Sequence, residues 1–145
     1  MIVENDSIEL KNVVSRKYGL HYSQFPEVMK DFYQLLHDKK LTPTGTLFYT
    51  LNNIPIDEQM AVEVFATVKE SYVPQDTDLF FRSYFTVTDM IMTYYFGDVE
   101  KLTELAYAEL IRFVEENDFE LASPFFHFFK GDQNFQYIEL KVGVR

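Results

Sequence analysis

Two glutamates placed beside aromatic residues are the strongest candidates for chemistry in this chain. Glu63 lies two residues before Phe65, in a stretch where apolar and polar residues alternate. Glu139 lies two residues after Tyr137, in a second stretch of the same kind. Residues two apart share one face of a β-strand, so each carboxylate is expected beside aromatic rings. Such a surface attracts a delocalised cation through Coulomb and cation–π forces. The sequence therefore predicts a ligand-binding site, with these candidate residues: Glu139, Glu63, Tyr137, Phe65, Phe135 and His127.

The other residues that could take part in binding or catalysis form weaker patterns. His127 lies in a run of phenylalanines, where it faces either the ligand site or the core. The three histidines are far apart, no His-x-His spacing occurs, and there is no cysteine, so neither a metal site nor a thiol nucleophile is expected. No glycine-rich phosphate loop is present either, and we expect no cofactor. Asp89, inside an apolar stretch, either faces the ligand site or marks a β-bulge.

Two helices are predicted from apolar residues that recur every three or four positions. One begins near Phe25 and ends near Leu41, before a loop at 42–45 that contains proline and glycine. The other begins at Gly97 and Asp98, with Asp98 as the capping residue, and ends near 119. Each helix carries one apolar stripe, so each is expected to cover one face of a sheet.

Strands are expected where the apolar period changes to two. The predicted strands cover residues 8–16, 47–52, 60–69, 83–95, 125–129 and 135–144. In 60–69 and 135–144 the aliphatic residues share one face, and Glu63 and Glu139 lie on the other. The order strand, helix, strand, strand therefore occurs twice, in pseudo-repeats at about 8–69 and 83–145. We predict an α+β fold in a single domain, 1–145: an antiparallel sheet with two helices on one face and an open groove on the other.

The chain resembles a known family over nearly its whole length. The residues that carry the resemblance are Tyr95-Phe96-Gly97-Asp98, the helix to Phe119, the turn Ala122-Ser123-Pro124, and the closing Tyr137-Ile138-Glu139-Leu140-Lys141-Val142. They are similar to the gyrase-inhibitor-like (GyrI-like) effector-binding domain, a ligand-sensing module of bacterial multidrug-responsive regulators that also occurs as a stand-alone protein. The family's final strand usually closes with proline and valine, whereas this chain has Gly143 and Val144. The resemblance implies a central groove in which the glutamate matched by Glu139 meets cationic lipophilic ligands.

Composition limits the partners. The chain has 145 residues, with 13 Lys and Arg against 23 Asp and Glu, a formal charge of −10. An acidic chain without a basic cluster repels phosphate backbones, so direct binding to nucleic acid is not expected. No apolar run reaches the roughly 20 residues that span a bilayer, and the acidic N-terminus is unlike a signal peptide. We therefore expect a cytoplasmic protein, without membrane contact, whose partner is a cation or a basic protein.

Three functions fit these patterns. The first is non-enzymatic binding or sensing of a small cationic or amphipathic molecule. The second is a protein-interaction module, such as an immunity or accessory factor of a toxin, because the high negative charge suits a basic partner. The chain also dimly resembles small proteins encoded beside secreted toxins. The third is a groove hydrolase that uses Glu63, Glu139 and Tyr137 as acid and base. Under the first function no residue is catalytic, and an aromatic open face could equally form a homodimer interface.

Overall fold

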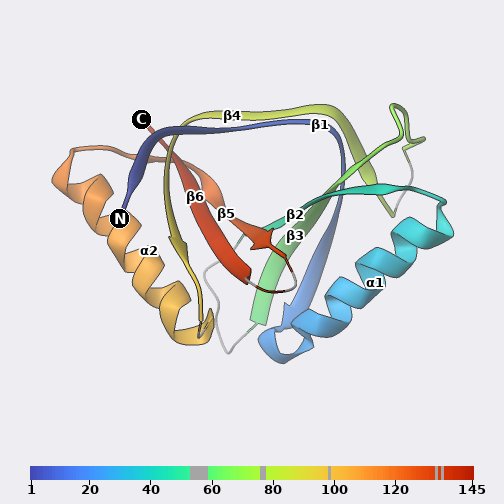
Figure 1. Cartoon of the computed structure of the whole chain (residues 1–145), viewed down its shortest axis with the longest axis horizontal. Coiled ribbons are helices and arrows are strands. Elements are labelled where there is room, and N and C mark those ends of the chain that lie inside the picture. Colours follow the sequence, from blue (N-terminus) through green and yellow to red (C-terminus); the bar gives the residue numbers. More distant parts are fainter. Residues whose placement is uncertain (53–58, 76–77, 98, 133, 135) are drawn as a thin grey trace. The chain divides into compact units, whose positions relative to one another are not determined.

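The computed structural model describes residues 1–145 except 53–58, 76–77, 98, 133 and 135, and it describes no side chains at 99–101. The chain divides into two compact units, which we call the first unit (residues 9–85) and the second unit (residues 1–8 and 86–145). Figure 1 shows the elements in chain order: β1 (Val3–His21), a short 3-10 helix (Tyr22–Gln24), α1 (Phe25–Asp38), β2 (Pro43–Leu51), β3 (Gln59–Val68), β4 (Phe80–Tyr95), α2 (Val99–Glu116), β5 (Leu121–Gly131) and β6 (Gln136–Val144).

In the first unit, β3 lies between β1 and β2 and pairs antiparallel with both. The register aligns Glu63 with Lys17 of β1 and with Thr50 of β2. It also aligns Phe65 with Phe48. Cross-strand neighbours point to the same side of a sheet, so the candidate residues Glu63 and Phe65 lie on one face with these partners.

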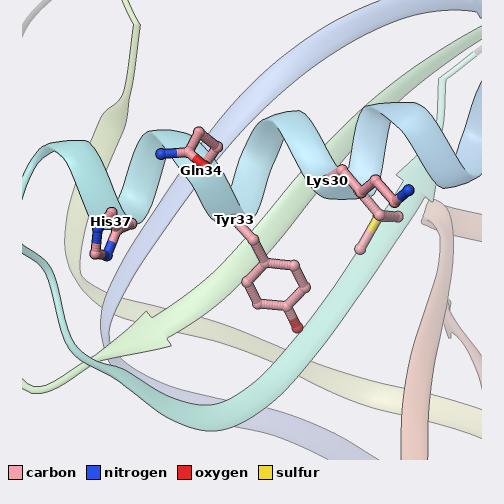
Figure 2. Close-up of a pocket in the computed structure, with 5 residues that line it drawn as sticks. Lys30, Tyr33, Gln34 and His37 are labelled. Atoms are coloured by element: carbon pink, nitrogen blue, oxygen red, sulfur yellow. The ribbon is translucent and has the colours of Figure 1, made fainter.

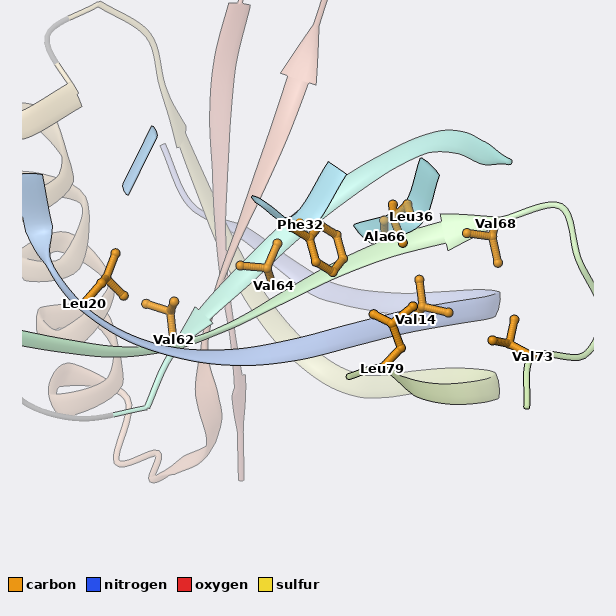
Figure 3. Packing of buried hydrophobic residues seen from close by; sticks show 10 residues of the cluster. All are labelled: Val14, Leu20, Phe32, Leu36, Val62, Val64, Ala66, Val68, Val73 and Leu79. Atoms are coloured by element: carbon orange, nitrogen blue, oxygen red, sulfur yellow. The ribbon is translucent and has the colours of Figure 1, made fainter. Parts of the chain in front are cut away.

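Helix α1 covers the other face of this sheet. Its residues Phe32 and Leu36 are buried in one cluster with aliphatic side chains of β1 and β3 and of the segment that follows β3. Figure 3 shows ten members of the cluster: Val14, Leu20, Phe32, Leu36, Val62, Val64, Ala66, Val68, Val73 and Leu79. The alternation along β3 therefore separates an aliphatic face under the helix from a face that carries Glu63 and Phe65.

The second unit repeats this arrangement. β6 lies between β4 and β5 and pairs antiparallel with both. Helix α2 packs its residues Ala106, Leu110 and Val114 against aliphatic side chains of the sheet, among them Leu140 and Val142. The prediction of an α+β fold made of duplicated β-α-β-β units with antiparallel strands is confirmed. The prediction of a single domain over 1–145 stays a prediction.

Several element boundaries differ from the sequence-based expectation. β2 begins at Pro43, inside the predicted loop, and its pairing with β3 shifts between Pro43 and Leu47. Proline is tolerated as the first residue of a strand, and Gly45 adopts φ +109, which suits an irregular start. β5 begins at Leu121, so the predicted turn 122–124 is instead part of a strand whose register shifts before Phe125.

Two further expectations concern single residues. Asp89 is exposed and has φ +55, a left-handed conformation that breaks the regular strand, so the bulge is the better interpretation. The predicted capping residue Asp98 lies outside the described residues. In the described part of the chain, no helix is both long and apolar enough to cross a membrane.

Candidate functional site

Glu63 is a nearly buried carboxylate held by two neighbours in the first unit. The hydroxyl of Ser15, which is fully buried, donates a 2.7 Å hydrogen bond to Glu63 Oε2. Arg82 Nη1 lies 3.6 Å from the same oxygen and donates a 3.0 Å hydrogen bond to Ser15 Oγ. The Glu63 side chain is only 11% exposed, so its negative charge is balanced locally by Arg82 rather than by bulk water.

Aromatic rings surround the guanidinium of Arg82. Its central carbon lies 4.4 Å from the ring centroid of Phe80, 5.6 Å from that of Phe65 and 5.8 Å from that of Phe85. Phe65 in turn stacks on Phe48 at 4.6 Å with nearly parallel rings. Distances below about 6 Å allow cation–π attraction. The site therefore combines a carboxylate and aromatic rings around a planar cation, which is the chemistry expected for Glu63 and Phe65.

A pocket of about 460 Å³ opens beside this cluster. It is lined by Ser15, Arg16, Lys17, Glu63, Asp78, Leu79, Phe80 and Arg82, all in the first unit. The volume lies in the range of small-molecule sites, which span roughly 300–1,000 Å³. Apolar side chains and convergent charges in one hollow make it the best candidate site in the described part of the chain.

Glu139 occupies the matching position in the second unit, on the central strand and away from the helix. Its Oε1 lies 3.9 Å from Lys130 Nζ and 4.0 Å from Lys141 Nζ. Both ammonium groups lie near the ring of Phe128, at 5.5 and 5.2 Å from its centroid. Lys141 Nζ also forms a 2.9 Å ion pair with Asp6. The expected carboxylate and aromatic pair is present here too, but two lysines of the chain already contact it.

Of the remaining predicted site residues, the structure describes Tyr137 and His127, which lie on opposite faces of the sheet of the second unit. Tyr137 contacts Tyr94, with ring centroids 6.3 Å apart. Phe135 lies outside the described residues. His127 lies on the face covered by α2, opposite to Glu139, because its Nε2 shares a 2.6 Å hydrogen bond with the hydroxyl of Tyr107 on that helix. The orientation of His127 toward the ligand face was therefore the wrong alternative, and the core alternative holds.

Burial determines the ionisation of this histidine and tyrosine pair. His127 is 2% exposed, and burial lowers its pKa to about 3. Burial also raises the pKa of Tyr107 well above its usual range. A neutral imidazole that is closed off from solvent serves packing rather than proton transfer. In the described residues no group of three or more His, Asp or Glu side chains could hold a metal ion.

A second hollow, of about 580 Å³, runs along α1 and is shown in Figure 2. Lys30, Tyr33, Gln34 and His37 project into it from one helix, together with Met29. A site with side chains from a single helix lacks the convergent walls that enclose a small ligand. This hollow is therefore a weaker candidate than the pocket beside Glu63.

The sequence analysis did not identify Arg82 and Ser15. Arg82 is the single charged residue in the aromatic run Phe80-Phe81-Arg82-Ser83-Tyr84-Phe85, and Ser15 interrupts an apolar stretch after Val13 and Val14. A cation among aromatic residues is a signal that could have pointed to the site. What local sequence does not encode is that both residues meet Glu63.

Comparisons with known proteins identify a matching family and several structures with a similar fold. A family model described as "Domain of unknown function (DUF5085)" matches residues 9–145. No curated protein matches the chain. Among solved structures, the C-terminal domain of EcmrR aligns with a TM-score of 0.74 at 17% identity, covering 97% of this chain and 96% of that one. A hydrolase from Listeria innocua aligns with a TM-score of 0.63 at 10% identity, covering 100% of this chain and 90% of that one.

The EcmrR chain in a cryo-EM structure of an EcmrR–DNA complex aligns with a TM-score of 0.77 at 18% identity. The alignment covers 99% of this chain but only 57% of that one, so this chain spans little more than half of EcmrR. Identities this low establish a shared fold and leave function to be argued from the site itself.

Proposed function

The chain belongs to the DUF5085 family, and we propose that it binds a small amphipathic molecule with a cationic group, in the pocket beside Glu63. In this proposal the carboxylate of Glu63 attracts the cation, and the phenylalanine rings that now surround Arg82 contact the apolar part. The chain acts as a binding or sensing protein and catalyses no reaction. The shared fold with the C-terminal domain of EcmrR, together with the resemblance to gyrase-inhibitor-like domains, supports this choice.

One observation carries the proposal: Arg82 already lies in the pocket in the manner of a ligand. Its guanidinium is a planar, delocalised cation, 4.4 Å from the Phe80 ring and 3.6 Å from Glu63 Oε2. Guanidinium is weakly hydrated, as are the delocalised cations of aromatic dyes. A site whose shape and charge accommodate one such group is suited to another of similar chemistry.

Hydrolysis is less well supported by the same geometry. Ser15 lines the pocket, but the residue is fully buried and its hydroxyl donates its proton in a hydrogen bond to Glu63. Arg82 also donates a hydrogen bond to Ser15 Oγ, so the proton and one of the two lone pairs of this hydroxyl are already engaged. A buried, doubly hydrogen-bonded hydroxyl is a structural link rather than an attacking group.

Titration with a cationic dye such as rhodamine 6G, followed by calorimetry, tests this function. Glu63→Gln retains the shape and an acceptor for Ser15 but removes the charge. We expect it to weaken binding about tenfold, the equivalent of about 1.4 kcal/mol. The matched control is Glu139→Gln, which removes the same charge at the equivalent strand position of the second unit and should leave affinity unchanged. Equal affinities for the unaltered chain and Glu63→Gln would refute the proposal.

A further inference from the structure

The pocket beside Glu63 holds more positive than negative side chains. Among its lining residues Arg16, Lys17 and Arg82 are cationic, whereas Glu63 and Asp78 are anionic. Both carboxylates are already engaged, Glu63 by Arg82 at 3.6 Å and Asp78 by Arg16 and Lys39, each at 3.9 Å. Arg16 also lies 4.0 Å from Asp31 of α1. The local excess of positive charge is opposite in sign to the net charge of the whole chain, −10.

A ligand cation that binds Oε2 of Glu63 has to replace Arg82 there. Glu63 is nearly buried, and its Oε2 already accepts the hydrogen bond from Ser15 and faces the guanidinium. The replaced guanidinium stays attached to the chain at the wall of the pocket, which Arg16 and Lys17 also line. A purely cationic ligand thus adds a positive charge to a pocket that already has an excess, and the mutual repulsion weakens its binding.

We propose, building on the proposed function, that this pocket prefers a zwitterionic amphiphile to a simple cation. The cationic group of the ligand takes the place of the Arg82 guanidinium at Glu63, and its anionic group pairs with the displaced guanidinium. Arg82 therefore has two roles. It occupies the site as an internal ligand when the pocket is empty, and it recognises an anionic group when the pocket is filled.

The position of Lys17 supports the same ligand class. Lys17 is the cross-strand neighbour of Glu63, so the two side chains emerge on one face of the sheet. It is exposed, whereas Glu63 is nearly buried. The charges of the pocket are therefore ordered, with the carboxylate of Glu63 inside and the ammonium of Lys17 near the mouth. A ligand whose cationic group lies inside and whose anionic group lies toward the mouth would match this order.

Indole ligands of different charge test the inference with little background. The chain contains no tryptophan, so the fluorescence of an indole excited near its red edge reports binding directly. Tryptophan is a zwitterion at neutral pH, tryptamine is a cation, and indole-3-propionate is an anion, all with the same apolar ring. We expect the unaltered chain to bind tryptophan about tenfold more tightly than tryptamine, and indole-3-propionate less tightly than tryptophan.

Variants of the arginines separate the role of Arg82 from a general effect of charge. Arg82→Gln should reverse the preference, because tryptamine no longer competes with the guanidinium and the carboxylate of tryptophan loses its cationic partner. Arg82→Lys retains the charge and should keep the preference for tryptophan. This variant also provides a test of the role of Arg82 if Arg82→Gln does not fold. Arg16→Gln removes a pocket cation that pairs with Asp78 instead of Glu63, so it should reduce the preference for tryptophan by lowering the excess positive charge, but should not reverse it.

The outcomes distinguish this inference from the function on which it rests. If rhodamine 6G binds in a Glu63-dependent way while tryptamine binds as tightly as tryptophan, the zwitterion preference is wrong and the proposed function stands. If Arg16→Gln rather than Arg82→Gln reverses the preference, the role assigned to Arg82 is wrong. If neither the dye nor any indole binds the unaltered chain, both proposals are wrong.

Discussion

The buried His127 makes the stability of this protein depend on pH in a way that can be calculated. Burial lowers its pKa to about 3 in the folded chain, whereas an exposed histidine has a pKa of about 6.5. Below the unfolded pKa, the unfolded chain takes up a proton that the folded chain excludes, so stability falls as pH decreases. Between pH 7.5 and pH 5 this single histidine should cost about 2 kcal/mol of unfolding free energy.

Urea unfolding at pH 7.5, 6 and 5, followed by circular dichroism, measures the effect. The control is His127→Gln, which keeps a polar partner for Tyr107 but does not titrate in this range. The carboxylates of the chain contribute equally to both proteins, so the difference between them isolates the histidine. We expect the stability advantage of the unaltered chain over His127→Gln to shrink by about 2 kcal/mol from pH 7.5 to pH 5. A change below about 0.5 kcal/mol would show that the imidazole is not kept neutral, contrary to this reasoning.

Two substitutions test the packing of each unit by the same unfolding assay. Phe32→Ala should cost about 3–5 kcal/mol, because the ring is fully buried between α1 and the sheet of the first unit; a loss below about 1 kcal/mol would contradict this packing. Gly143→Ala should cost about 1–3 kcal/mol, because an added Cβ would lie 3.1 Å from Ser123 Oγ, which accepts the Gly143 N–H hydrogen bond. Gly19→Ala is its control, since nothing lies within 4 Å of the Cβ position there, and equal effects of the two glycine substitutions would count against the close approach at Gly143.

The alternation of aliphatic and polar residues was sufficient to predict which face of β3 and of β6 packs against a helix. In β3 and β6 the aliphatic residues alternate with Glu63 and Glu139, and the structure places the aliphatic residues under α1 and α2. The pattern works because the two faces differ in polarity: the face under the helix is aliphatic, and the other face carries a glutamate, even in β3, where both faces are buried. The equivalent placement of the two glutamates could be predicted for the same reason.

The pattern failed where the two faces of a strand do not differ in polarity. In β5, Phe126, His127 and Phe128 are all buried, so no alternation distinguishes the helix side from the ligand side. The side chain of His127 could be assigned only from its contact with Tyr107, which is 20 residues away. Hydrophobic period is informative only when the two faces differ in polarity.

The candidate site could be predicted only in part, because its cations come from distant segments. Arg82 follows Glu63 by 19 residues and meets it through the tertiary fold, and the pattern of neither segment contains that contact. The sequence predicted an attraction between aromatic rings, a carboxylate and an external cation. The structure adds that a cation of the chain itself already lies there, which turns a simple binding site into one where a ligand must compete.

Mapping of bound rhodamine 6G by NMR tests the central claim most directly. If the ligand binds beside Glu63, the largest shifts should appear at the backbone amides of Ser15 and Glu63 and at the side-chain Nε–H of Arg82, with the Arg82 signal moving toward that of a solvent-exposed arginine. Shifts concentrated at Glu139 and Lys141, or an Arg82 signal that stays unchanged at saturation, would contradict the account.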